Sequence, residues 1–376
     1  MKITFLVQDL MGGGVQYATA SMVRAFYEHG YQVELLTSRY HERLLKQGRK
    51  PFEVPEGVKT IIMPSERSSR NILFLRRYMK RTDSQYIIAE SGLYSDALRI
   101  AAIGLWKHPR LIQVWHGDTP SMEVPFLEAI KRKIRYGFKY RKFFALYTVN
   151  SKIGQAVLRI TKALKPERVV TVWNPVVDEV FKRKLESPTT HPWLVDKKCP
   201  TFITAGACDR NKGHMAVIKA IEKASKVQKM RLVVFGTGVL ENEFRKYVKE
   251  HDLEAVISFA GFCDNLPAEM KSADGFVLGT HVESFAIVLV EAMACGVPCV
   301  STDAPWGPRE VLDNGKYGRL VPVGDVEAMA AALVDLAAGR IPVAPPEAWQ
   351  RYTIDKIFER YCKVMGGIGG RSRNMV

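Results

Sequence analysis

Short apolar segments alternate with helical segments along the chain, and this alternation limits the fold more than any other feature. In the first half, strand-like segments occur at residues 3–8, 32–36, 60–63, 86–89, 111–114 and 146–149. In the second half they recur at residues 201–205, 231–235, 256–260, 275–278 and 299–301. Strands that alternate with helices indicate parallel sheets with helices on both faces. The sequence therefore predicts an α/β fold.

The length of 376 residues is too great for one ordinary core and suits two domains of roughly 150–200 residues. We expect two parallel-sheet α/β domains in tandem with a cleft between them, an N-terminal one at 1–172 and a C-terminal one at 173–350. A polar linker at 186–192 and a terminal helix at 349–365, followed by a tail at 366–376, complete this organisation; the second domain ends at 350, and 351–376 form the final segment. Ligands of such sheets bind at the carboxyl ends of the strands.

Composition excludes several other classes of protein. Gly and Pro occur at ordinary frequency, which argues against a disordered or collagen-like chain. No apolar run reaches the roughly 18 residues of a membrane-spanning helix, and residues 3–7 are too short for a signal-peptide core. The six cysteines show neither C-x-x-C pairs nor zinc-site spacing, so we expect reduced thiols and no metal. These features predict a cytoplasmic protein.

The positive charge is concentrated in the first half. Residues 1–172 contain 29 Lys and Arg against 14 Asp and Glu, or +15 of the total +16. Basic residues are densest in a segment with an apolar residue every four positions: Lys131, Arg132, Lys133, Arg135, Lys139, Arg141 and Lys142. A basic amphipathic helix is typical of contact with an anionic membrane, although a solvated helix face remains open. The asymmetry predicts an anionic partner for the N-terminal half.

Two strand ends in the first half carry candidate ligand contacts. Gly12–Gly14 separate a strand from a helix, but Tyr17 occupies the third glycine position of the dinucleotide fingerprint. Gly13 and Gly14 therefore either approach a ligand or simply form a tight turn. His116 follows a strand and precedes a glycine, which places it at the ligand-binding edge, although a structural role is equally open.

Two segments of the second half point to a phosphate and a sugar. Residues 206–214 place Lys212 and Arg210 at the start of a helix, where a cation and free N–H groups can bind a diphosphate, although a lysine there is often merely solvated.

Glu283 and Glu291 are eight positions apart, roughly 12 Å if helical, and suit the hydroxyls of a nucleotide-sugar. Amides near 284–287 would meet the leaving phosphate. Alternatively, Glu283 merely caps the helix and Glu291 is an ordinary exposed residue. The apolar run around Glu291 favours a functional role, because burial of a carboxylate without a partner is costly.

Together these pieces resemble retaining glycosyltransferases of family 4, which have the GT-B architecture of two Rossmann-like domains that face each other across a cleft. The resemblance implies that the N-terminal domain binds the acceptor and that the C-terminal domain binds the nucleotide-sugar donor. It also implies that the helix of the final segment at 351–376 returns to the N-terminal domain. The resemblance spans nearly the whole chain and is densest over residues 201–323, where HVESFAIVLVEAMACGVP and GPRE follow one another. It implies a nucleotide-sugar co-substrate, most often a UDP-sugar, and no cofactor or metal. It assigns His116, Glu283 and Lys212 to catalysis. It implies a donor site that contains Gly13, Gly14, Arg210, Lys212, Gly236, Phe262, Glu283, Ser284, Phe285, Ala286 and Glu291.

The sequence departs from the family at two positions. Ala207 stands where the family has an arginine after its glycine, so that Arg210 or Lys212 alone must serve the phosphate. Ala286 stands where the family often has glycine. Both departures leave Lys212 and the two glutamates in place, so we expect an active enzyme.

The resemblance and the charge together predict the reaction. We expect a retaining, metal-independent transfer of a hexose or N-acetylhexosamine to a membrane-associated glycan or glycolipid. The context would be lipopolysaccharide, capsule or polyprenyl-linked oligosaccharide assembly at the inner face of the cell membrane. The alternatives are a GT-B nucleotide-sugar epimerase, or a basic membrane- or nucleic-acid-binding protein without catalysis. We expect no nucleic-acid partner, because such a protein would leave Glu283 and Glu291 unexplained.

Overall fold

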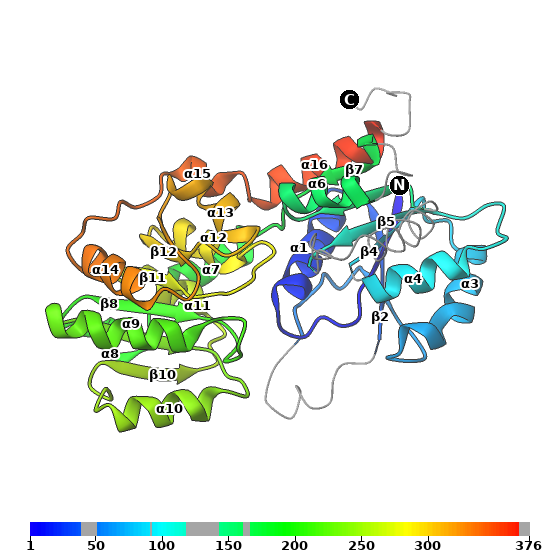
Figure 1. The fold of residues 1–376 in the computed structure, drawn as a ribbon. Helices are drawn as coiled ribbons and strands as arrows, with labels where there is room; N and C mark the ends of the chain where they lie inside the picture. Colours follow the sequence, from blue (N-terminus) through cyan, green and yellow to red (C-terminus); the bar gives the residue numbers. More distant parts are fainter. Residues whose placement is uncertain (39–50, 91, 118–142, 161–165, 368–376) are drawn as a thin grey trace, which may run out of the picture. The chain divides into compact units, whose positions relative to one another are not determined.

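The computed structural model describes residues 1–38, 51–90, 92–117, 143–160 and 166–367. The chain forms two compact units, which Figure 1 shows as two separate sets of strands and helices. Unit 1 comprises Met1–Pro175 and Ile354–Val376, and unit 2 comprises Val176–Thr353. The last helix therefore belongs to the unit that contains the N-terminus.

Unit 1 is built on a parallel sheet. Over the described residues its strands lie in the order β3-β2-β1-β4-β5-β6-β7. The strands are β1 (Lys2–Leu6), β2 (Gln32–Thr37), β3 (Lys59–Ile62), β4 (Tyr86–Ala89), β5 (Arg110–Trp115), β6 (Ala145–Thr148) and β7 (Val169–Thr171). The helices are α1 (Gly14–Glu28), α3 (Ile72–Arg81), α4 (Gly92–Ala101), α6 (Ser151–Ile160) and α16 (Ile354–Gly367). All four residues of β4 and of β6 are buried, as expected for central strands that helices cover on both faces.

Unit 2 repeats this plan with a parallel sheet in the order β10-β9-β8-β11-β12-β13. Its strands are β8 (Thr201–Ala205), β9 (Arg231–Phe235), β10 (Ile257–Gly261), β11 (Gly275–Leu278), β12 (Cys299–Thr302) and β13 (Arg319–Val321). Its helices are α7 (Glu179–Glu186), α8 (Pro192–Val195), α9 (His214–Val227), α10 (Glu241–Glu250), α11 (Leu266–Lys271), α12 (Ile287–Ala294), α13 (Gly307–Val311), α14 (Val326–Ala337) and α15 (Pro346–Gln350). Helices α9 and α14 pack side by side over a core that includes Phe202, Val234 and Val300.

The structure confirms the predicted α/β fold and each predicted strand, with shifts of one or two residues at their ends. It adds the edge strands β7 and β13, which the sequence analysis did not predict. Each has three residues, and all three residues of β7 are half-buried. Such short segments lack the alternating or continuous apolar pattern by which a strand is predicted.

We predicted a single helix at 349–365, but its predicted first residue is wrong, because helix α16 begins at Ile354. Helix α15 ends at Gln350, and a turn follows: the Tyr352 carbonyl accepts a hydrogen bond from the Val176 amide (3.0 Å), and Thr353 forms a bridge with Val177. Helix α16 begins at Ile354 and packs on α1 in unit 1, where the Phe358 and Phe26 rings lie 4.9 Å apart. The boundary between the units thus falls inside the expected helix.

The basic segment that the sequence analysis assigned to a membrane lies outside the described residues. This applies to all seven of its cations, Lys131, Arg132, Lys133, Arg135, Lys139, Arg141 and Lys142. Among the helices that the structure describes, none combines the length and the apolar character needed to cross a membrane.

Candidate functional site

The loop from residue 206 to residue 213, between β8 and α9, is held by close backbone contacts in unit 2. Gly213 has a φ of +63°, and a Cβ atom at this position would lie 1.9 Å from the Gly279 carbonyl oxygen. The His281 amide donates to the Asn211 carbonyl (2.8 Å), and the Lys212 amide donates to an Asp209 carboxylate oxygen (3.0 Å). The loop is thereby fixed to the segment that joins β11 to α12.

This packing brings the Lys212 ammonium into an ion pair with the Glu283 carboxylate. Both side chains stay partly accessible, with 29% of Lys212 and 19% of Glu283 exposed. Arg210, on the same loop, is exposed and forms no ion pair with any residue that the structure describes. A partly open ammonium at the carboxyl end of a parallel strand can bind an anion.

Glu283 does not lie on the helix that carries Glu291. It forms a bridge with Trp306, and its carbonyl accepts a hydrogen bond from the Gly307 amide (2.7 Å). Helix α12 begins at Ile287, after Ala286 in the left-handed region at φ +66°. The helix covers only the part of the interval from Ile287 onward, so the spacing of roughly 12 Å for eight helical residues does not follow for the two glutamates. The left-handed backbone also explains why glycine suits position 286.

Glu291 is a half-buried carboxyl group on α12. Burial raises its pKa to about 7, and the charge of Lys184 counteracts this rise in part. Within the described part of the chain, its carboxyl group has neither a hydrogen-bond donor nor an ion-pair partner. A desolvated carboxylate without donors gains most from a ligand that brings hydroxyl groups.

The other predicted donor residues of unit 2 occupy different surroundings. Gly236 follows β9, and its amide donates to the Gly261 carbonyl (2.7 Å). Phe262 follows β10 with half of its surface exposed, and Ser284 is partly exposed. The Phe285 side chain is buried and packs edge-on against Tyr352, with 5.3 Å between ring centroids. Phe285 therefore offers a ligand its backbone rather than its ring.

In unit 1, the glycine turn follows β1 and starts α1. Gly12 and Gly13 have φ values of +61° and +109°, and α1 begins at Gly14. The Met11 amide donates to a carboxylate oxygen of the buried Asp9 (2.9 Å), which fixes the start of the turn. Gly13 and Gly14 are exposed, so their amides are accessible to a ligand.

His116 pairs with a residue that the sequence analysis did not single out. Its Nε2 atom lies 2.7 Å from a carboxylate oxygen of Glu90, which is buried directly after β4. Strands β4 and β5 are neighbours, so both side chains stand at the same edge of the sheet. Glu90 follows the apolar strand YIIA as His116 follows its own strand, and this shared position was the available signal. Nε2–H can donate to Glu90, which leaves Nδ1, buried and without a partner among the described residues, as an acceptor.

No group of three His, Cys, Asp or Glu side chains gathers in a geometry for a metal ion within the described residues. Unit 2 thus offers one ammonium and two carboxylates in different surroundings, and unit 1 by itself offers a histidine–glutamate pair.

Two family patterns match the chain. Residues 12–180 match the family described as Glycosyltransferase Family 4, and residues 190–354 match that described as Glycosyl transferases group 1. Among curated proteins, the chain is similar to the N-acetylgalactosamine-N,N'-diacetylbacillosaminyl-diphospho-undecaprenol 4-alpha-N-acetylgalactosaminyltransferase of Campylobacter jejuni. This match is 28% identical over 185 residues and covers 49% of the chain and 48% of the relative. The phosphatidyl-myo-inositol mannosyltransferase of Mycolicibacterium smegmatis is 37% identical over 142 residues, 36% of each protein.

The chain spans about half the length, or less, of these curated relatives. Among solved structures it is similar to Anabaena HepE, crystallised with UDP and glucose, at a TM-score of 0.73 and 16% identity over 98% of this chain and 100% of that one. This likeness shows the fold, the GT-B arrangement of two Rossmann-like domains. Because the two family patterns together cover most of its length, the chain belongs to the family 4-type glycosyltransferases.

Proposed function

We propose that this protein moves a hexose or N-acetylhexosamine from a UDP-sugar to a hydroxyl of a membrane-associated glycan or glycolipid, with retention of anomeric configuration. The observation that carries this proposal is the accessible Lys212–Glu283 pair at the carboxyl edge of the second sheet. Glu291, with its pKa raised to about 7 and no donor among the described residues, supports the same assignment.

The donor would rearrange this ion pair. Its diphosphate binds the Lys212 ammonium and releases Glu283, which then accepts hydrogen bonds from the sugar hydroxyls. Glu291 accepts hydrogen bonds from the ribose hydroxyls. The first amides of α12 have no partner within the helix and stabilise the negative charge that develops on the leaving phosphate.

The reaction would proceed without a protein base at the acceptor. The bond between the anomeric carbon and the phosphate oxygen breaks through a loose, oxocarbenium-like transition state. The acceptor oxygen bonds to the same face of that carbon, and its proton passes to the leaving phosphate oxygen. His116 lines the reacting centre, and Lys212 supplies the charge that a metal supplies in other transferases.

The relatives support the choice of donor and acceptor. The Anabaena protein was crystallised with UDP and glucose, and the Campylobacter relative acts on a glycan linked to diphospho-undecaprenol. An acceptor of this kind agrees with the +15 charge of residues 1–172, because anionic lipids attract basic proteins. The enzyme would then work in the cytoplasm, at the inner face of the cell membrane, in lipopolysaccharide, capsule or polyprenyl-linked oligosaccharide assembly.

Thermal stabilisation by UDP, GDP, ADP and TDP, each with and without Mg²⁺, tests the donor site. At 100 times its dissociation constant, UDP should raise the free energy of unfolding by about 2.7 kcal/mol, with or without Mg²⁺. Lys212→Met should abolish this shift, since it removes the cation that binds the diphosphate. The control Lys229→Met removes an exposed lysine that has no ion pair within the described residues, and should keep it.

A Lys212→Met protein that still binds UDP as wild type does would contradict the donor assignment. With transfer established, NMR of the product distinguishes retention from inversion at the anomeric carbon. A change of sugar configuration without an acceptor would instead favour the epimerase.

A further inference from the structure

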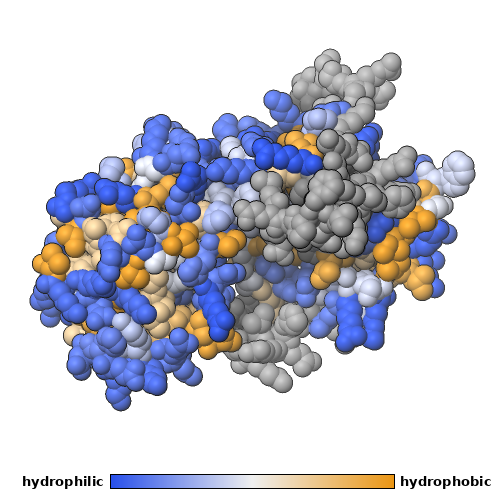
Figure 2. Space-filling model, viewed as in Figure 1, coloured by the Kyte–Doolittle hydropathy of each residue, from blue (hydrophilic) through white to orange (hydrophobic). Residues whose placement is uncertain are grey.

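The outer surface of α3 and of the segment after α4 exposes large apolar side chains. Leu73 on α3 is 68% exposed, Ile103 is 54% exposed, and Trp106 is fully exposed. Ile100, at the end of α4, is exposed as well. We call these four residues the apolar ridge. Figure 2 shows hydrophobic side chains gathered over α3 and α4, on the right of the view.

Hydrogen bonds join the two segments that carry the ridge. The Arg76 guanidinium on α3 donates hydrogen bonds to the carbonyls of Ala101 (2.9 Å) and Ile103 (2.5 Å). These bonds attach the segment after α4 to the helix turn that follows Leu73. The segment that carries Ile103 is therefore held against α3 by the fold of unit 1.

Cations stand beside the apolar ridge. Leu73, Arg77 and Lys80 are four and three positions apart, so they share the exposed face of α3, and Arg81 follows. Lys107 follows Trp106. These four cations are exposed, and within the described residues none of them forms an ion pair. Their charge is thus available to an external anion.

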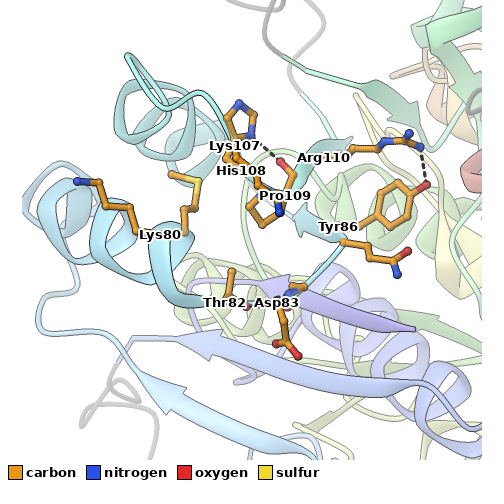
Figure 3. Close-up of a pocket in the computed structure, with 11 residues that line it drawn as sticks. Lys80, Thr82, Asp83, Tyr86, Lys107, His108, Pro109 and Arg110 are labelled. Carbon is orange, nitrogen blue, oxygen red and sulfur yellow. Dashed lines mark hydrogen bonds between the residues drawn. The ribbon is translucent and has the colours of Figure 1, made fainter.

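A cavity of about 730 Å³ opens next to these residues (Figure 3). It is lined by the end of α3 and by the loops that enter β4 and β5, with Lys80 on one side of the view and Arg110 on the other. The Arg110 guanidinium donates to the Tyr86 hydroxyl (3.1 Å). Asp83, a carboxylate of this lining, is paired with Lys2 (2.6 Å), which leaves the lining positive.

This cavity lies at the amino ends of β4 and β5, whereas Glu90 and His116 lie at their carboxyl ends. A six-residue strand such as β5 separates the two edges by about 20 Å. The cavity is therefore distinct from the candidate catalytic edge of the same unit.

We propose that the apolar ridge and the basic cavity form a docking surface for a bilayer that contains anionic phospholipid. Exposed Trp and Ile side chains enter the interfacial region, while Arg and Lys attract the lipid phosphates. The cavity accepts the phosphate of one headgroup. The strand length between the two edges then favours an acceptor whose reacting sugar is separated from its lipid by further sugars. This inference extends the proposed function, but its test reads binding rather than transfer.

Flotation with phosphatidylglycerol–phosphatidylcholine vesicles, against phosphatidylcholine alone, tests this surface. The wild type should bind the anionic vesicles selectively. Lys80→Gln with Lys107→Gln should weaken this binding by roughly 25-fold, about fivefold for each charge removed. Ile103→Ser with Trp106→Ser should weaken it by about tenfold or more, also at high salt, where charge is screened.

Control variants in unit 2 remove two exposed lysines or one exposed aliphatic residue. Lys229→Gln with Lys249→Gln removes two exposed lysines without ion pairs among the described residues, and Val227→Ser removes an aliphatic residue that is 75% exposed. Both controls should bind vesicles as the wild type does. If the ridge and cavity variants bind as well as these controls, the proposal is overturned, even if the wild type binds vesicles through other residues.

Two further measurements distinguish a bilayer-docking surface from a free-phosphate site and from a nucleic-acid surface. Inorganic phosphate at millimolar concentration should compete weakly with vesicles, since it lacks the apolar contact; complete competition would make the cavity a free-phosphate site and overturn docking. A loss of single-stranded DNA binding without a loss of vesicle binding would likewise overturn it. All variants should retain the stabilisation by UDP, so a failure of docking and a failure of the donor site remain distinguishable.

Discussion

The carboxyl group of Glu291 opposes stability at neutral and higher pH. In the folded state its pKa is raised from 4.5 to about 7 because burial disfavours the charged form. A group of this kind stabilises the fold fully below pH 4.5, and its contribution is lost as the pH rises through 7. At higher pH the protein keeps an ionised carboxylate that no donor among the described residues compensates.

We therefore expect Glu291→Gln to stabilise the protein at pH 8 and to have little effect at pH 4.5. The gain at pH 8 should be of the order of 2 kcal/mol in the free energy of unfolding, or roughly 5 °C in melting temperature. Thermal melts of both proteins from pH 4.5 to 8.5 measure this difference. The variant should also lose affinity for UDP. A pH-independent difference would show that Glu291 is not desolvated in the folded protein.

The residue scale also shows why some site residues could be predicted and others could not. Lys212 and Glu283 each carried a local signal, a cation at a helix start and an acid before a helix. Their pairing joins positions 71 residues apart and needed the packing of two loops. Glu90 had the same kind of signal as His116 but was missed. Its pairing with His116 became visible only in the 2.7 Å contact between residues that follow neighbouring strands.

At the scale of elements, the loop before α9 depends on the absence of a side chain at Gly213. Gly213→Ala would place a Cβ against the Gly279 carbonyl oxygen and force the two loops apart. Gly339 offers a matched control, because its φ of +69° is nearly the same and no atom lies within 4 Å of its Cβ position. Both variants therefore strain the backbone at a positive φ, but only Gly213→Ala also places a side chain against the neighbouring loop.

We expect Gly339→Ala to lower the free energy of unfolding by about 1 kcal/mol and to leave UDP binding unchanged. Gly213→Ala should lower it by at least about 2 kcal/mol more and weaken UDP binding by about tenfold or more, because Lys212 is the adjacent residue. Urea unfolding and UDP titration of both variants give these values. Equal effects of the two substitutions would contradict a crowded contact between the loops.

At the scale of the whole molecule, the chain returns to unit 1 through α16. Phe358 is 8% exposed; its ring lies 4.9 Å from the Phe26 ring and stacks on His29 at 3.9 Å. Phe358→Ala should therefore destabilise unit 1 by about 3–5 kcal/mol, although it lies near the end of the chain. Phe244→Ala, a buried phenylalanine of α10, should instead destabilise unit 2.

Hydrogen exchange of backbone amides, resolved by peptide, measures these effects separately. Phe358→Ala should speed exchange in β1 and α1, and Phe244→Ala should speed it in β8 and β9. Faster exchange confined to α16 itself would show that unit 1 does not depend on the returning helix.

The sequence alone determined what depends on neighbouring residues. Apolar periodicity predicted nearly all strands and the helices between them, the Gly12–Gly14 run marked the turn after β1, and residue types suggested anion and hydroxyl binding. Tertiary structure decided what depends on distant contacts. Strand order brought Glu90 to His116, loop packing brought Lys212 to Glu283, burial raised the pKa of Glu291, and aromatic packing assigned α16 to unit 1. Local patterns fix backbone conformation, whereas charge pairing and desolvation depend on which segments the fold places side by side.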